Sequence, residues 1–109
     1  MDIKEIQELV VANSERYSKK HNIKIDLNWL LLKLMEENGE FANALLIYTK
    51  KCRPEKFVDS GTAKENLSSE LIDIFTTIVL LADSLDIDIL SSLNKKVLEK
   101  GRKYLKSQE

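Results

Sequence analysis

The chain has 109 residues and a formal net charge of −1 at pH 7; 43% of its residues are hydrophobic and 32% are charged. This length predicts one domain, residues 1–109, and the composition excludes an intrinsically disordered chain. The near-zero net charge excludes recruitment by a bulk electrostatic field, so we expect neither a nucleic-acid polymer nor a membrane as a partner.

Cysteine usage and hydropathy restrict the class of protein further. Cys52 is the single cysteine, which excludes an internal disulfide framework and fits a reducing cytoplasm. No apolar run reaches the ~18 residues that a membrane span requires. The acidic, amphipathic first residues do not resemble a signal peptide. We therefore expect a cytoplasmic protein.

Two helices are predicted in the first half of the chain. Residues 3 to about 19 repeat apolar side chains at helical spacing, and residues 19–22 break the pattern as a polar loop. A second helix is predicted from near Asp26 or Asn28, either of which can cap it, to about residue 51, before Arg53 and Pro54 end it. Its apolar stripe consists of Leu30, Leu34, Phe41, Leu45 and Tyr48.

Three carboxylates interrupt this second helix. At ~100° per residue, Glu37 falls inside the apolar stripe, and Glu40 falls at its edge one turn later. Glu36 falls farther round, toward the polar flank. A carboxylate inside an apolar stripe predicts a buried acid that needs a partner.

A third helix follows the longest predicted loop and begins at a Thr62-x-x-Glu65 pattern that resembles a capping box. It is apolar on nearly all sides, apart from a narrow polar strip formed by Glu70, Asp73 and Thr77. Such a helix must be covered on nearly all sides, which three other helices of a small chain would hardly manage. We therefore expect a second copy of the chain to cover it.

The last helix is predicted over residues 88 to 105, with a basic polar side. Gly101 is expected to weaken this helix by ~1 kcal/mol and to bend or end it. The predicted fold class is all-α: an antiparallel bundle of four main helices, completed by dimerisation or by a dimer of dimers.

The two acid pairs point to a metal site. Residues three apart on a helix face the same way, so Glu37 with Glu40, and Glu70 with Asp73, can meet across an antiparallel helix pair. Four unpaired anions would repel or protonate, and a hard cation removes that cost. Ligands that are all oxygen favour Mg²⁺, with Mn²⁺ as the alternative, over zinc or a di-iron centre with its Glu-x-x-His pairs.

The motif Glu36-Glu37-x-x-Glu40 followed by Glu70-x-x-Asp73 resembles the signature of the MazG-like all-α nucleoside triphosphate pyrophosphohydrolases. The resemblance implies that Glu37, Glu40, Glu70 and Asp73 bind Mg²⁺. It implies that Glu36 assists, either as an outer-sphere ligand or as the catalytic base that orients the attacking water. The substrate-binding candidates are Trp29, Lys33, Asn94, Lys96, Lys100 and Arg102.

The implied activity is hydrolysis of a nucleoside triphosphate to the monophosphate and pyrophosphate, in cleaning or control of a nucleotide pool. Base selection would depend on groups outside the motif, with Trp29 a candidate for stacking on the base or an anchor at the start of its helix. Three alternatives stay open at this point. They are a narrower dUTP or dCTP pyrophosphatase, an enzyme acting on a non-nucleotide diphosphate, and a helical interaction module whose acids are merely solvated.

Overall fold

The structure, a computed structural model, describes all 109 residues and consists of helices and connecting loops without a strand. The first three long helices are α1 (Ile3–His21), α2 (Leu27–Tyr48) and α3 (Ser60–Ser84), with a short 3₁₀ turn at Pro54–Lys56. A C-terminal arm, residues 89–107, joins α4 (Ile89–Leu93), a π-helical turn (Asn94–Leu98) and α5 (Glu99–Ser107) into one continuous rod. The predicted all-α class with four main helices is confirmed.

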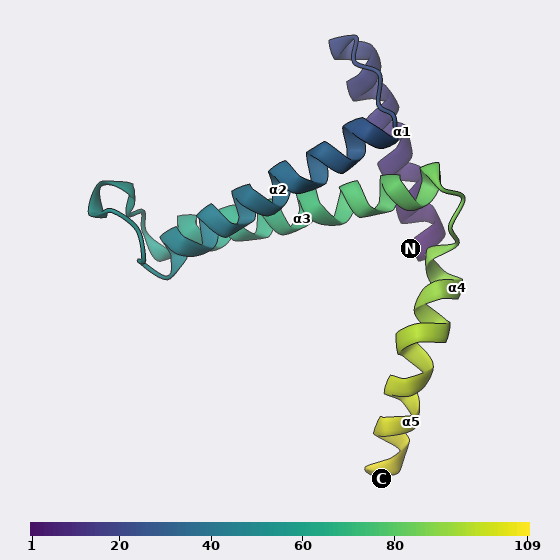
Figure 1. Cartoon of the computed structure of the whole chain (residues 1–109). Coiled ribbons are helices and arrows are strands. Elements are labelled where there is room, and N and C mark those ends of the chain that lie inside the picture. Colours follow the sequence, from purple (N-terminus) through teal and green to yellow (C-terminus); the bar gives the residue numbers. More distant parts are fainter.

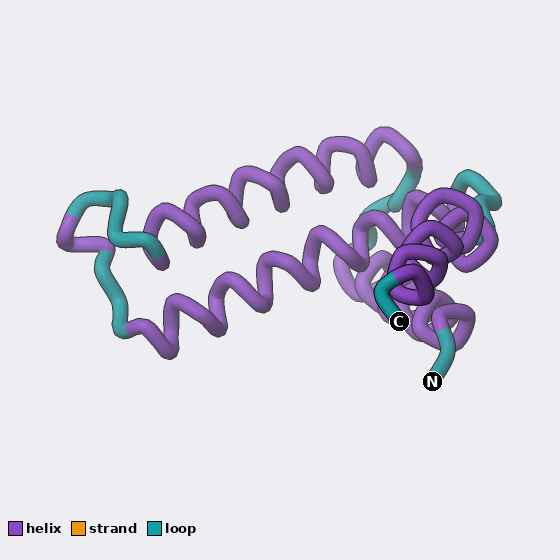
Figure 2. The backbone as a smooth tube through the Cα atoms, turned by 90° about the horizontal axis from the view of Figure 1, so that it is seen from below, coloured by secondary structure: helices purple, strands orange, loops and turns teal.

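The centre of the fold is an antiparallel hairpin of α2 and α3, which lie side by side along their length (Figures 1 and 2). Its contact face is made of small and aliphatic residues: Leu30, Ala44, Ala63 and Leu67 are all buried. Helix α1 crosses the C-terminal end of α3, near the start of α2. The core is small, because only eight residues in the chain are buried.

Aspartates begin the long helices. The Asp26 carboxylate accepts a hydrogen bond from the Trp29 backbone N–H at 2.9 Å, which confirms Asp26 as the cap of α2. The capping box predicted at Thr62 is wrong, because α3 begins two residues earlier, at Ser60. Asp59 is its cap: its two carboxylate oxygens accept from the Thr62 backbone N–H at 2.8 Å and from the Thr62 hydroxyl at 2.7 Å.

Three helices end in the same way. Asn22, Lys50 and Asp86 adopt left-handed backbone conformations with φ between 52° and 58°. In each case the next N–H donates to the carbonyl five residues earlier, which closes the helix end. These turns correct two predicted boundaries, because α1 continues through His21 and α2 ends at Tyr48 rather than near residue 51.

The C-terminal arm differs from its prediction. Gly101 does not end the helix, which continues to Ser107. The irregularity lies upstream, in the π-helical turn at Asn94–Leu98, where an extra residue is accommodated within the helix. The arm projects sideways from the hairpin (Figure 1), and its main packing contact is with α1. The four helices therefore do not close into a bundle within one chain.

None of the helices combines the length and the apolar character needed to cross a lipid bilayer.

Candidate metal site

Four carboxylates from two helices converge midway along the hairpin. Glu37 and Glu40 come from α2, and Glu70 and Asp73 come from α3. One oxygen from each of them lies within 4.8 Å of the corresponding oxygens of the other three. The arrangement follows from the sequence, because each pair is spaced i, i+3 and the two helices are antiparallel neighbours. The structure thus brings together the four residues predicted as metal ligands.

Two of these carboxylates each have a buried oxygen without a hydrogen-bond partner. The Glu37 residue is only 4% exposed, which confirms its predicted burial within the apolar stripe. Its Oε1 lies 3.4 Å from the Lys33 ammonium, whereas its Oε2 is buried without a hydrogen-bond partner. Glu70 Oε2 is likewise buried and unpartnered. A buried anionic oxygen without a partner is costly, so the site is one that a cation would stabilise.

The pKa values of two of the carboxyl groups also indicate that positive charge would stabilise the cluster. Burial raises the pKa of Glu37 above its ordinary value, and the nearby Asp73 and Glu40 carboxylates raise it further, against the opposing effect of Lys33. Burial also raises the pKa of Glu70, again reinforced by Glu40 and Asp73. Each raised pKa means that the ionised form of the carboxyl group is disfavoured in the cluster. A divalent ion would reverse that preference.

Lys33 is the one cation beside the cluster. Its ammonium donates to Glu36 Oε1 at 2.7 Å, and this hydrogen bond is the largest cause of the raised pKa of Lys33. The same ammonium lies 5.8 Å from the centroid of the Trp29 ring. Glu36 itself is largely exposed and is not one of the four converging carboxylates, as its predicted place toward the polar flank implies.

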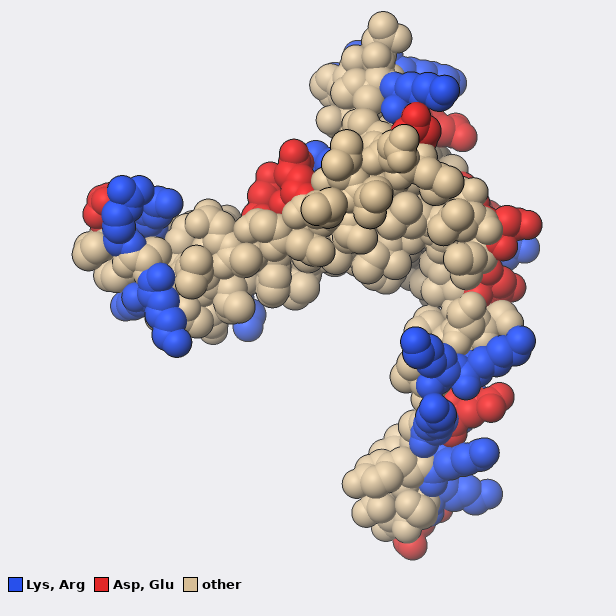
Figure 3. Space-filling view, viewed as in Figure 1, with Lys and Arg blue, Asp and Glu red and all other residues tan.

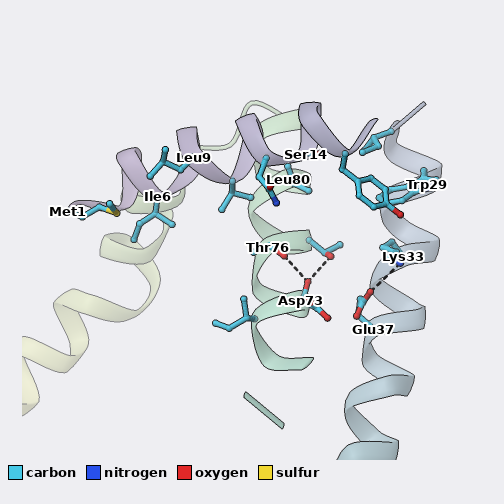
Figure 4. A pocket seen from close by; sticks show the side chains of 16 residues that line it. Met1, Ile6, Leu9, Ser14, Trp29, Lys33, Glu37, Asp73, Thr76 and Leu80 are labelled. Carbon is cyan, nitrogen blue, oxygen red and sulfur yellow. Dashed lines mark hydrogen bonds and ion pairs between the residues drawn. The ribbon is translucent and has the colours of Figure 1, made fainter. Parts of the chain in front are cut away.

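A cavity of about 610 Å³ opens beside the acids, between α1, α2 and α3 (Figure 4). Lys33, Glu37 and Asp73 line its polar end. Trp29 and Tyr17 line it from α2 and α1, with ring centroids 6.4 Å apart. The remaining lining is mostly aliphatic, from residues that include Ile6, Leu9, Val10, Ile72 and Leu80. This cavity thus joins an apolar, aromatic interior to the acid cluster.

A second hollow of about 410 Å³ lies on the other side of the cluster. Glu40 and Glu70 line it together with Glu36, Asn43 and Asn66. The four converging carboxylates therefore border two cavities, one largely apolar and one polar. Sequence reasoning missed the two asparagines, although their spacing contained a signal: Asn43 follows Glu40 by three residues and Asn66 precedes Glu70 by four.

The other predicted substrate-binding residues lie elsewhere. Asn94, Lys96, Lys100 and Arg102 belong to the C-terminal arm, and none of them lines either cavity at the acids. Lys96 instead borders an apolar groove between α4 and the end of α3. Figure 3 shows the basic side chains of the arm well apart from the acidic group on the hairpin. Within one chain, the acids and the arm's basic residues do not form one site.

No family model, curated protein or solved structure matches this chain.

Proposed function

We propose that the chain is a Mg²⁺-dependent hydrolase that cleaves nucleoside triphosphates to the monophosphate and pyrophosphate, with a MazG-like fold that pairs with a second copy. The observation that carries the proposal is the convergence of four carboxylates, two with unpartnered buried oxygens, at the mouth of a cavity. That cavity falls within the range of about 300–1,000 Å³ typical of small-molecule sites.

The donor set suits a hard divalent cation. All four ligand groups are carboxylates, and no histidine or cysteine belongs to the cluster. In this proposal Glu37, Glu40, Glu70 and Asp73 hold Mg²⁺, with Mn²⁺ as a substitute. The bound ion would neutralise charge on the phosphate chain and lower the pKa of a water molecule.

The remaining residues have roles that their positions support. The indole of Trp29 and the phenol of Tyr17 line the apolar cavity, where a nucleobase would stack. The Lys33 ammonium is placed to contact a phosphate at the junction of cavity and acids. Glu36 borders the polar hollow, where its carboxylate would orient a water molecule if the substrate phosphate took over its contact with Lys33.

Pyrophosphate release from a panel of nucleoside triphosphates, with and without Mg²⁺, tests this function. We expect Mg²⁺-dependent release that Glu37→Gln and Asp73→Asn each reduce at least about 100-fold, a loss in the range expected when charge stabilisation at a reacting centre is removed. Glu65→Gln is the matched control, because Glu65 is exposed on α3 and lies outside the cluster. Turnover that survives both cluster substitutions would refute the metal-site mechanism.

The panel also distinguishes the narrower enzymes. Activity confined to dUTP or dCTP would identify a housekeeping pyrophosphatase of that specificity. Release from a non-nucleotide diphosphate alone would point to another substrate class.

A non-catalytic helical interaction module is the second candidate, favoured by the many large apolar side chains that are exposed on α2 and α3. This candidate predicts no hydrolysis of any substrate and no change of thermal stability with Mg²⁺. The proposed enzyme instead predicts hydrolysis of a substrate and a change of thermal stability with Mg²⁺.

A further inference from the structure

The hairpin tip, residues 48–64, comprises the end of α2, the connecting loop and the start of α3, and it projects at the end of the hairpin away from α1 (Figure 1). Backbone hydrogen bonds hold its loop. The Lys51 N–H donates to the Leu46 carbonyl at 2.8 Å, and the Phe57 N–H donates to the Pro54 carbonyl at 3.0 Å. The tip therefore presents its side chains from a folded, hydrogen-bonded loop.

Positive charge gathers at this tip. Residues 48–64 contain five basic and two acidic residues, a net charge of +3, whereas the rest of the chain contains twelve basic and sixteen acidic residues, a net charge of −4. Figure 3 shows basic side chains at this end of the hairpin, apart from the acidic group farther along it. The five are Lys50, Lys51, Arg53, Lys56 and Lys64. The net charge of −1 for the whole chain therefore conceals a local basic patch.

The two acidic residues of the tip neutralise little of this charge. Glu55 Oε1 lies 3.4 Å from Arg53 Nε, and both side chains are mostly exposed, so the pair is weak. Both carboxylate oxygens of Asp59 already accept hydrogen bonds from Thr62. None of the four lysines of the tip forms an ion pair. Their ammonium groups are therefore free to meet an anionic partner.

Apolar side chains lie among these cations. Tyr48, Phe57 and Val58 are each 41% or 42% exposed. The Lys50 ammonium lies 6.0 Å from the centroid of the Phe57 ring, and the Lys64 ammonium lies 5.8 Å from that of Tyr48. A surface that combines exposed apolar groups with unpaired cations matches the boundary of an anionic bilayer, where charged headgroups adjoin apolar acyl chains.

The shape of the tip favours a bilayer over a nucleic-acid strand. Proteins that bind single strands usually hold the backbone in a basic groove. Residues 48–62 line neither of the cavities beside the acids nor the groove beside α4. The tip is instead the projecting end of two helices (Figures 1 and 2), which can reach a flat surface without interference from the rest of the chain.

We propose that the hairpin tip docks on the surface of a bilayer that carries anionic phospholipids, with Phe57 and Val58 entering the headgroup region and the lysines facing the headgroups. This partner differs from the expectation based on net charge. Net charge averages over the whole chain, whereas at physiological ionic strength screening limits the attraction to groups within about 8 Å. The proposal does not depend on the proposed hydrolase, because none of the four converging carboxylates belongs to the tip.

Co-sedimentation with vesicles tests the charged part of the contact. We expect the wild type to bind phosphatidylcholine vesicles that contain phosphatidylserine, to bind less as salt rises, and not to bind phosphatidylcholine alone. Each basic residue near an anionic surface strengthens binding roughly fivefold, so Lys50→Gln, Lys51→Gln and Lys56→Gln together should weaken it about 100-fold.

The matched control removes three charges from the arm, through Lys95→Gln, Lys103→Gln and Lys106→Gln together, and should weaken binding less than about fivefold. A wild type that does not bind phosphatidylserine vesicles would overturn the proposal. Equal losses in the tip variant and the arm variant would overturn it as well.

A second variant tests the apolar part of the contact. Phe57→Ser should weaken binding to the same vesicles about tenfold or more, because burial of an aromatic side chain is lost. Leu32→Ser is the control, since Leu32 is exposed on α2 and lies outside the tip. Unchanged binding of Phe57→Ser would overturn the proposed insertion. Polyuridine RNA provides the other comparison: binding that requires the tip lysines, without binding to vesicles, would assign the patch to nucleic acid and overturn the proposal.

Discussion

We expect Glu37→Gln to be more stable than the wild type without Mg²⁺ and less stable than the wild type with Mg²⁺. Glu37 is nearly buried, and one of its oxygens lies within 4.8 Å of an oxygen of each of the three other carboxylates. At this separation two unit charges repel by about 3.5 kcal/mol with an effective dielectric constant of 20. Burial raises the pKa of Glu37, and the Asp73 and Glu40 carboxylates raise it further, so proton uptake relieves part of the cost of this charge. We therefore expect Glu37→Gln to stabilise the metal-free protein by only about 1–2 kcal/mol at about pH 8.

The pH dependence has a defined sign. The pKa of Glu37 is raised in the folded state from its ordinary 4.5, so the folded chain binds more protons than the unfolded chain above that pH. The stability of the metal-free wild type should therefore fall as pH rises from about 4.5 through the raised pKa. The variant lacks this titration, so its advantage should shrink as pH approaches about 5.

Mg²⁺ should change the sign of the difference. Ligand at one hundred times its Kd stabilises a folded protein by about 2.7 kcal/mol, and Glu37→Gln should lose most of that gain. Thermal unfolding with and without Mg²⁺ measures the effect, at about 4–8 °C per kcal/mol for a domain of this size. Glu65→Gln should follow the wild type in every condition, since it lies outside the cluster. A variant that is less stable than the wild type without metal, or equally stabilised by Mg²⁺, would refute the reasoning.

Three further outcomes are expected. Trp29 is the single tryptophan and lines the cavity, so nucleotide with Mg²⁺ should quench its fluorescence in the wild type, and an unchanged emission would exclude it from the binding site. Leu30→Ala should destabilise the chain by about 2–5 kcal/mol in urea unfolding, since Leu30 is 1% exposed near the start of α2, whereas Leu32→Ala on the exposed side should cost far less. Leu31→Glu should shift sedimentation toward the monomer, whereas Val58→Glu at the hairpin tip should not; unchanged assembly in Leu31→Glu would argue against the exposed apolar side chains of α2 as an interface.

Local patterns determined the parts of the fold that depend on one helix at a time. Glu37 was predicted as the buried acid because its wheel position lies between Leu34 and Phe41, and helical periodicity does not depend on what the helix packs against. Residue type alone gave Asp26 and Asn28 as candidate caps of α2, and the structure shows that Asp26 is the cap. The boundary at Thr62 was wrong because two signals competed, and Asp59 with two acceptor oxygens satisfied both Thr62 donors first.

The grouping of the four acids depends partly on the sequence and partly on the tertiary structure. Spacing paired Glu37 with Glu40, and Glu70 with Asp73, but whether the pairs meet depends on the register of α2 against α3. That register is set by buried contacts such as Leu30, Ala44 and Leu67, whose shapes no periodicity describes. The same packing produced the two cavities on either side of the cluster, and with them Asn43 and Asn66, which sequence reasoning had passed over.

The sequence by itself determined that the chain is helical, where its apolar stripes lie and which acids share a helix face, because these properties depend on residues within a few turns of one another. Only the tertiary structure decided that the C-terminal arm leaves the hairpin and takes Lys96, Lys100 and Arg102 with it. The direction of that arm depends on the turn at residues 85–88 and on the contact between α4 and α1, which join segments far apart in the chain. The helix periodicity of residues 88–105 is the same whichever way the arm points.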